Sequence, residues 1–168
     1  MTTAQFLFLS AFTLVNLVVV AAVVVVVREA RRVDGGALWS KTLLRRLGRL
    51  PSERTEVNRL AFYVHRLSGI AIFAFLALHI IDVSLFAISA ELYDDVHQLY
   101  GTVVMRLFEC GLLFALLFHA LNGLRLIAID VWDLGSGAAT RILNGVVVAS
   151  VLVTLAGSIV ILRPVFAA

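Results

Sequence analysis

Residues 6–27 read FLFLSAFTLVNLVVVAAVVVVV, a run of 22 residues without a single charge. A transmembrane helix needs about 20 mainly apolar residues to cross the hydrocarbon core of a bilayer. Three further segments meet this requirement, at about 60–88, about 103–129 and 142–162. A lone strand in lipid leaves its backbone polar groups unsatisfied, so even the valine-rich stretches are expected to be helical. The sequence therefore predicts an all-α integral membrane protein, a bundle of four transmembrane helices.

The composition of the whole chain agrees with this fold class. Of its 168 residues, 61% are apolar and 15% are charged, whereas about a quarter of a soluble domain is charged. These values exclude a disordered chain and argue against a water-soluble domain. The basic isoelectric point, near 9.6, then indicates a membrane protein with one basic surface rather than a partner of nucleic acid. The single cysteine, Cys110, excludes an internal disulfide framework and a multi-cysteine metal site.

The charged residues predict the orientation of the four spans. Nine basic and four acidic residues fall between Arg28 and Arg59, and basic residues concentrate in cytoplasmic loops. The 89–102 loop contains acidic residues but no Lys or Arg, so we expect it outside. The short 130–140 turn is flanked by Arg125 and Arg141 and should be cytoplasmic. Both termini are therefore predicted to lie outside.

The same features divide the chain into three parts. These are an N-terminal transmembrane anchor helix (1–27), a basic cytoplasmic segment (28–59) and a three-helix membrane domain (60–168). No basic residue precedes the first span and no small-residue cleavage site follows it, so we interpret it as a retained anchor rather than a signal peptide. Within the basic segment, 37–50 has apolar residues at helical spacing opposite Lys41 and several arginines. It is either an amphipathic helix at the lipid surface or a docking surface for a soluble partner.

Polar residues inside the spans are costly in lipid, so each needs a partner or a function. The second span holds His65, Arg66, Ser68, His79 and Asp82, and the third holds Arg106, Glu109, His119, Asn122 and Arg125, with Asp130 at its end. Ala115 and Gly123 lie four residues on either side of His119, which predicts a slot beside its imidazole. A haem needs such a slot, and neutral imidazole is a good axial ligand for its iron. The alternative is a histidine that only packs between helices.

Two short motifs resemble a known family. His65-Arg66-Leu67-Ser68-Gly69 is similar to the His-Arg-x-Ser/Thr-Gly signature of the cytochrome b subunit of succinate dehydrogenase. Residues 118–125, FHALNGLR, resemble that family's second signature, His-x-x-x-Gly-x-Arg, and Asp130 stands where its following Asp belongs. The resemblance covers about residues 58–162, and actinobacterial members look closest. The family usually has three helices, so the first span and the basic segment are additional here.

The resemblance implies roles for individual residues. His119 would be an axial ligand of haem b, with the other axial ligand supplied by a partner membrane subunit. The residues near the haem propionates and the quinone would be His65, Arg66, Ser68, Arg125 and Asp130. Two departures concern the quinone pocket: Phe62 replaces a Ser that many members have, and Leu126 replaces a second His.

The number of haem groups stays open, at one or two. His79 lies 14 residues after His65, about 21 Å along a helix, and some relatives hold a second haem at the equivalent of this span. We therefore consider His79 a candidate ligand of a second haem. Against this, Phe75 and Val83 flank His79 on its face, and Asp82 could simply hydrogen-bond to it.

The resulting functional prediction is a haem-binding membrane anchor subunit of succinate:quinone oxidoreductase in a bacterial plasma membrane, serving respiratory electron transfer and the tricarboxylic acid cycle. Its partners would be an FAD flavoprotein subunit, an iron–sulfur subunit, a second membrane subunit, lipid, and menaquinone or ubiquinone as substrate. The chain has no nucleotide-binding glycine motif and no cysteine cluster, so we expect it to be a non-catalytic subunit that does not oxidise succinate itself. Two alternatives are a small transporter with a proton path along His79, Asp82, Arg106 and Glu109, and a structural anchor without haem.

Overall fold

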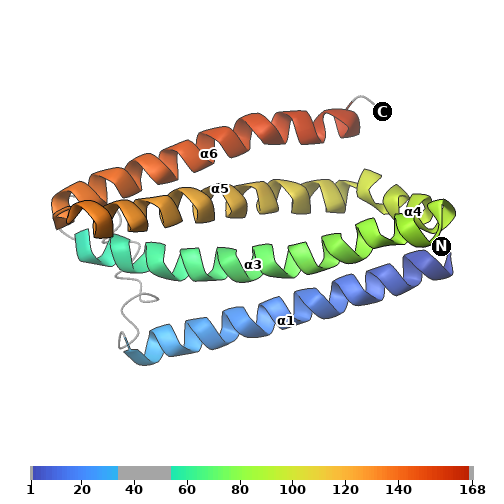
Figure 1. Ribbon diagram of the computed structural model, residues 1–168, viewed down its shortest axis with the longest axis horizontal. Coiled ribbons are helices and arrows are strands. Elements are labelled where there is room, and N and C mark those ends of the chain that lie inside the picture. The colour runs from blue at the N-terminus through green and yellow to red at the C-terminus, as the bar shows by residue number, and fades with distance from the viewer. Residues whose placement is uncertain (1, 34–53, 167–168) are drawn as a thin grey trace.

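The computed structural model describes residues 2–33 and 54–166 and contains four long helices lying side by side (Figure 1). They are α1 (Thr3–Val33), α3 (Arg54–Ile88), α5 (Val103–Trp132) and α6 (Ser136–Phe166). All four are long and apolar enough to cross a membrane, which confirms the predicted fold class. Each helix extends beyond its apolar run, because polar residues at a membrane surface can continue a helix. The 37–50 segment, with its two open interpretations, lies outside the described residues.

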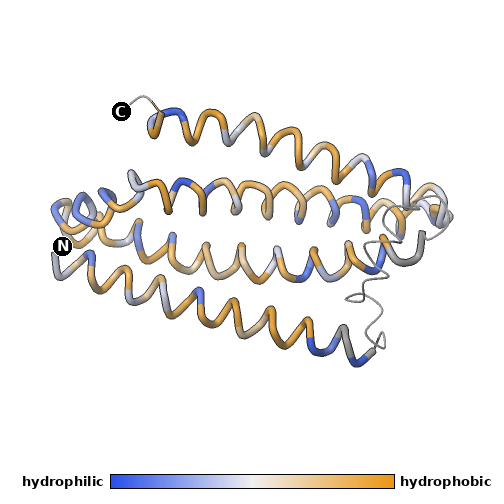
Figure 2. Tube along the Cα trace, turned by 180° about the vertical axis from the view of Figure 1, so that it is seen from behind, coloured by the Kyte–Doolittle hydropathy of each residue, from blue (hydrophilic) through white to orange (hydrophobic). Residues whose placement is uncertain are grey.

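The four helices alternate in direction along the layer. In Figure 1, α1 begins and α6 ends at the end of the bundle that carries α4, and the α5–α6 turn lies at the opposite end. These are called the α4 end and the turn end below. Figure 2 shows that hydrophobic residues dominate the middle of the helices, while hydrophilic residues are frequent towards both ends. This distribution is typical of helices that cross a hydrocarbon layer.

The connection between α3 and α5 differs from the simple loop expected from the sequence. It forms α4 (Ala90–His97) and a short 3₁₀ turn, η2 (Gln98–Gly101). The Ser89 side chain accepts a hydrogen bond from the Leu92 N–H, and the Thr102 side chain accepts one from the Met105 N–H. These caps satisfy backbone donors at the start of α4 and of α5. Because Val96 of α4 is completely buried, the connection folds back onto the bundle.

The α5–α6 connection is short because α5 ends in a left-handed residue. Asp133 has φ 46° and ψ 49°, and its N–H donates to the carbonyl of Ile129. Such a conformation closes a helix and reverses the chain within a few residues. The turn therefore sets α6 antiparallel and adjacent to α5.

Helix α1 is attached to the others chiefly at the α4 end. The Gln5 side chain donates from Nε2 to the carbonyl of Asp95 over 2.9 Å. Phe8 is buried in a cluster with Val96 and Met105, and the Phe12 ring meets Phe108 edge-on at 5.2 Å between centroids. The remaining length of α1 has no fully buried residue in the described part beyond Phe8, as expected of a helix that faces mostly lipid.

A polar network joins α3, α5 and α6 near the turn end. The Arg125 side chain is only 6% exposed. Its guanidinium donates to the carbonyl of Ala139 (3.0 Å), to Asn122 Oδ1 (3.2 Å) and to Asn58 Oδ1. Asn58 in turn donates from Nδ2 to Thr140 Oγ1 over 3.2 Å. Below, the Arg125 network means these five residues, Asn58, Asn122, Arg125, Ala139 and Thr140.

The Arg125 network lies beside a hydrophobic cluster that contains Ala61, Phe118, Leu143 and Val146. Three helices therefore contribute both apolar contact and directional hydrogen bonds at one level of the bundle. Hydrogen bonds that involve a charged group contribute more than neutral ones, about 1.5–3 kcal/mol each. The network consequently fixes how far each of the three helices is rotated about its axis.

We predict that Arg125→Leu destabilises the bundle by about 3 kcal/mol, because Asn58 and Asn122 lose a buried partner. The measurement is thermal unfolding of the purified protein in detergent, followed by circular dichroism. Arg141→Leu is the matched control, since Arg141 is an exposed arginine at the start of α6. Equal melting temperatures for the two variants would contradict the assigned role of the network.

Candidate functional site

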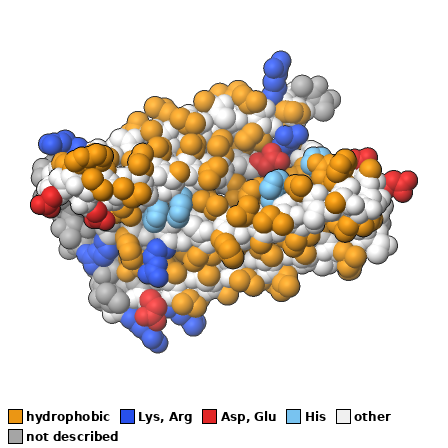
Figure 3. Space-filling view, in the orientation of Figure 1, with side chains coloured by type: hydrophobic (Ala, Val, Ile, Leu, Met, Phe, Trp, Pro, Cys, Tyr) orange, Lys and Arg blue, Asp and Glu red, His pale blue; other side chains and the backbone are white. Residues whose placement is uncertain are grey.

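Two histidines from different helices stack on each other in the half of the bundle nearer the turn end. The rings of His65 on α3 and His119 on α5 have centroids 4.0 Å apart and planes within 4° of parallel. Both side chains are half-buried, and histidine side chains are visible among hydrophobic ones on the face shown in Figure 3. The helix packing thus brings together the histidines of the two sequence motifs.

Hydrogen bonds to one nitrogen hold the His119 ring. His119 Nδ1 lies 3.0 Å from the carbonyl oxygen of His65 and 3.3 Å from Ser68 Oγ. A carbonyl oxygen can only accept, so this contact favours the tautomer with the proton on Nδ1. In that tautomer Nε2 has a free lone pair. A histidine held in this way has the arrangement that is usual for a metal ligand, in which the second ring nitrogen donates to a carbonyl.

Gly69 makes room for the His119 ring. A Cβ atom at this position would lie 2.8 Å from His119 Cε1 and 3.3 Å from Nδ1. Contacts this short do not occur, so any larger residue would displace the imidazole. Sequence reasoning noted Gly69 only as part of a motif, because its role depends on the residue of another helix that packs against it.

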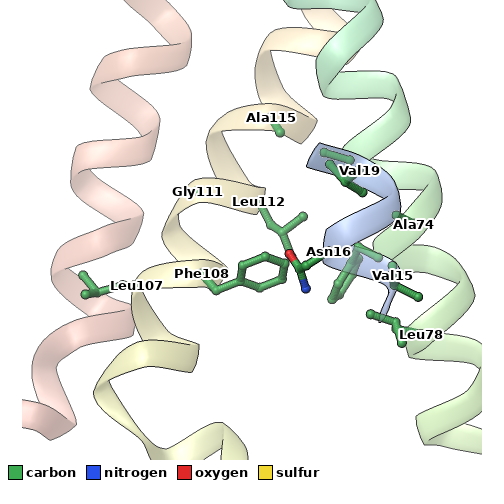
Figure 4. Close-up of a pocket in the computed structure, with 12 residues that line it drawn as sticks. Val15, Asn16, Val19, Ala74, Leu78, Leu107, Phe108, Gly111, Leu112 and Ala115 are labelled. Atoms are coloured by element: carbon green, nitrogen blue, oxygen red, sulfur yellow. The ribbon is translucent and has the colours of Figure 1, made fainter. Parts of the chain in front are cut away.

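The two small residues predicted to form a slot beside His119, Ala115 and Gly123, have other neighbours in the structure. Gly123 faces His65, whose Cε1 atom would lie 3.5 Å from a Cβ added there. Ala115 lines a cavity of about 300 Å³ between α1, α3 and α5. Figure 4 shows that cavity and the Asn16 amide, the one polar side chain among the labelled lining residues. Its lining is otherwise apolar, so it offers no group for chemistry.

The other residues of the first motif have distinct surroundings. Ser68 is 7% exposed, and its hydroxyl donates to the carbonyl of His65 over 2.9 Å. Arg66 is exposed, with its guanidinium carbon 5.4 Å from the centroid of the Phe62 ring. His65 Nδ1 is buried without a hydrogen-bond partner in the described part of the chain. The Ser68 hydroxyl therefore contacts both histidines of the pair, whereas the Arg66 side chain is exposed.

The structure does not gather all the residues of the second motif around His119. Arg125 and Asn122 belong to the Arg125 network, directed at α3 and α6. Asp130 is exposed near the end of α5. Of the residues predicted near one site, His65, Ser68 and His119 are thus in mutual contact. Arg66 is next to His65 in the sequence. Arg125 hydrogen-bonds across the three helices instead of contacting His119.

His79 has a different environment from His119. Its ring is exposed and stacks on Phe75 with centroids 5.6 Å apart. Asp82, the suggested hydrogen-bond partner of His79, is instead 2% exposed and lies close to Tyr100 of η2. Sequence reasoning missed this contact because Tyr100 lies in the segment expected to be a loop.

Comparison with known proteins identifies the family. A family model described as succinate dehydrogenase/fumarate reductase transmembrane subunit matches residues 46–157. The chain is 42% identical over 82 residues to the succinate dehydrogenase 2 membrane subunit of Mycobacterium tuberculosis, an alignment covering 49% of this chain and 60% of that protein. It is 35% identical over 108 residues to the succinate dehydrogenase hydrophobic membrane anchor subunit of Halobacterium salinarum, covering 58% of this chain and 81% of that one.

The matched residues include the histidine pair, Gly69 and the Arg125 network, and they begin after α1. The chain thus spans less than two thirds of the length of the mycobacterial relative but four fifths of the halobacterial one. The match covers well over half of this chain and includes α3, α5 and most of α6. The chain belongs to the succinate dehydrogenase/fumarate reductase transmembrane subunit family.

Proposed function

We propose that this protein is the haem b-binding membrane anchor subunit of a bacterial succinate:quinone oxidoreductase. The observation that carries the proposal is the hydrogen bond between His119 Nδ1 and the carbonyl of His65. This contact orients one imidazole and leaves its Nε2 free, on a face of the bundle where a second membrane subunit could pack. The similarity to two succinate dehydrogenase membrane subunits supports the assignment to this enzyme.

The donor set fits a haem. His119 would provide one axial ligand through Nε2, Gly69 keeps the ring in place, and Ser68 fixes the backbone turn beneath it. The second axial ligand would come from the partner membrane subunit. When bound, haem b supplies a group that carries one electron at a time.

The same helix turn supplies groups for a quinone. Arg66 is an exposed cation in the motif, and a cation stabilises a quinone oxygen that gains charge on reduction. His65 has a buried Nδ1 atom without a partner in the described residues, which suits a hydrogen bond to a ligand carried between the subunits. Asp130 is exposed at the same end of the bundle and could assist protonation. Arg125, which the resemblance also places near the quinone, hydrogen-bonds to Asn58 of α3 and to the Ala139 carbonyl of α6.

The partners follow from what this chain lacks and from its charge. The sequence has one cysteine and no cysteine cluster, so succinate oxidation would take place on FAD and iron–sulfur subunits. The basic 28–59 segment favours the turn end as the cytoplasmic side. We propose that the soluble subunits dock there, close to the histidine pair.

The first prediction concerns the haem ligand. We expect His119→Ala to abolish the b-type band in the reduced-minus-oxidised visible spectrum of the purified complex, because the axial nitrogen is removed. His97→Ala is the control, since His97 is exposed on α4, and its spectrum should be unchanged. We expect His79→Ala to keep the full haem content per flavin, because His79 has no hydrogen bond that orients its ring in the described structure. An intact complex without any haem would refute the proposal, and loss of half the haem in His79→Ala would establish a second site.

The second prediction concerns Gly69. Gly69→Ala should displace the His119 imidazole and lower haem affinity about tenfold, within the usual range for changes around metal ligands. Gly145→Ala is the matched control, since a Cβ added there meets nothing within 4 Å. The measurement is the haem-to-flavin ratio after purification, together with the reduction potential of the haem. Identical values for both variants would show that Gly69 does not position the ligand.

The third prediction concerns the quinone. We expect Arg66→Gln to raise the KM for quinone and lower the rate of quinone reduction, while haem content and succinate oxidation by an artificial electron acceptor are preserved. Arg106→Gln, in the other half of the bundle, is the control for loss of an arginine. Unchanged quinone kinetics in Arg66→Gln would remove Arg66 from the proposed site.

A further inference from the structure

A cavity lies where α1 diverges from the rest of the bundle. At the α4 end, α1 is held by the Phe12 ring, which meets Phe108 of α5 edge-on, and by the buried Phe8. Figure 1 shows α1 and α3 close together at that end and further apart towards the turn end. The cavity, of about 300 Å³, begins one turn after Phe12, between α1, α3 and α5, and it is partly open. Because α1 precedes the residues that match the family model, the additional helix forms one wall of this cavity.

The size and the lining of this cavity suit a small apolar ligand. Small-molecule sites are typically clefts of about 300–1,000 Å³ lined mainly by apolar side chains with a few polar groups. Alanines and a glycine of α3 and α5 keep the space open, namely Ala71, Ala74, Gly111 and Ala115. A Cβ atom added at Gly111 would meet nothing within 4 Å. Since the lining residues belong to membrane-spanning segments, the molecules that can reach them are those dissolved in lipid.

One polar side chain, Asn16, lines the cavity from α1. It stands at the midpoint of the uncharged run 6–27, where a polar group is costly in lipid and needs a partner or a function. Asn16 is half-buried. Figure 4 shows its amide directed from α1 towards Phe108 and Leu112 of α5. The amide therefore lies on the side of α1 that faces the protein.

The amide of Asn16 is only partly satisfied by its own helix. Its Nδ2 donates to the carbonyl of Phe12 over 2.8 Å, but no hydrogen bond to its Oδ1 is found among the described residues. Ser10 and Thr13, the other polar residues of the same run, are exposed, and each hydroxyl donates to a carbonyl of α1. Asn16 thus differs from them in presenting an open acceptor within an apolar cavity.

The chemistry of this acceptor narrows the class of ligand. An ordered water needs about two to four polar partners, and Asn16 is the one polar side chain that lines the cavity. A cation would be unbalanced, because no lining residue carries a negative charge. An ester or ketone oxygen only accepts hydrogen bonds and would leave Asn16 Oδ1 unpaired. A hydroxyl group can donate to Oδ1 without bringing a charge into the bundle.

We propose that the cavity between α1, α3 and α5 binds a lipid-soluble molecule with an apolar body and a hydroxyl group that donates a hydrogen bond to Asn16 Oδ1. The apolar body fills the space left by the small residues of α3 and α5. Binding is reversible and changes no covalent bond. Helix α1 then has a task besides anchoring the chain, because it supplies both a wall of the site and its one polar contact.

The experiment compares two photoreactive probes on the purified complex in lipid nanodiscs. One is dodecanol with a diazirine on its chain, and the other is the methyl ether of the same molecule, which has no donor hydrogen. Mass spectrometry of peptides from α1 and α5 locates the labelled residues. We expect half-maximal labelling of the cavity at an about fivefold lower concentration of the alcohol, the ratio that corresponds to one neutral hydrogen bond. Equal concentrations for the two probes would overturn the proposal.

Asn16→Leu tests the polar contact. In this variant the preference for the alcohol should disappear, because the acceptor is gone while the apolar wall remains. Thr13→Val is the matched control, since Thr13 is an exposed residue of the same helix whose hydroxyl bonds to the Leu9 carbonyl, and it should keep the full preference. A preference for the alcohol that survives in Asn16→Leu would show that Asn16 does not recognise the hydroxyl.

Gly111→Leu tests the position of the apolar body. Its side chain should occupy the cavity and lower the labelling of α1 and α5 by both probes at least fivefold, the ratio already expected for loss of one weak contact. Gly145→Leu is the matched control, because an added Cβ also meets nothing within 4 Å there and α6 does not line the cavity. Labelling of Gly111→Leu at the wild-type level would place the ligand elsewhere. None of these readouts depends on haem or quinone, so they stand or fall apart from the proposed function.

Discussion

The absence of water from the hydrocarbon core governs this structure. Every backbone polar group in a membrane-spanning helix must find a partner inside the protein, because lipid offers none, and an unpaired polar side chain there is costly. The hydrogen bonds of Arg125 to Asn58, Asn122 and the Ala139 carbonyl are the fullest example. They fix the rotation of α3, α5 and α6 about their axes, and that rotation decides which side chains meet elsewhere along the same helices.

The histidine pair depends on this rotation. His119 meets the carbonyl of His65 only while α5 presents the same face to α3 that buries Phe118 and Asn122. Gly69 then permits a contact that any other residue would prevent. The orientation of the His119 ring, which suits a haem ligand, therefore depends on how α5 packs at Asn122, one turn away. Arg125 affects the site indirectly, because it hydrogen-bonds to Asn122.

The two ends of the bundle carry different polar chemistry. Near the turn end, cationic and imidazole groups surround the proposed haem and quinone, and the Arg125 network stabilises them. At the α4 end, the carboxyl groups of Asp82 and Glu109 lie close to the Tyr100 phenol, and Glu109 pairs with Arg106. The middle of the bundle separates them with apolar residues. Helix α1, which precedes the family match, packs chiefly against the α4 end, where Gln5 contacts Asp95 and Phe8 contacts Tyr100.

The sequence alone determined the number and type of the long helices, because uncharged runs of about 20 residues have one stable form in lipid. The two motifs also identified His65, Ser68 and His119 as a group. Only the tertiary structure decided which polar residues meet across elements: Arg125 hydrogen-bonds to Asn58 of α3, and Asp82 lies close to Tyr100 of η2. The role of Gly69 and the fold of α4 were likewise decided there. Helical periodicity fixes the face on which a residue lies, but not the rotation or axial position of the neighbouring helix, and these determine the partner.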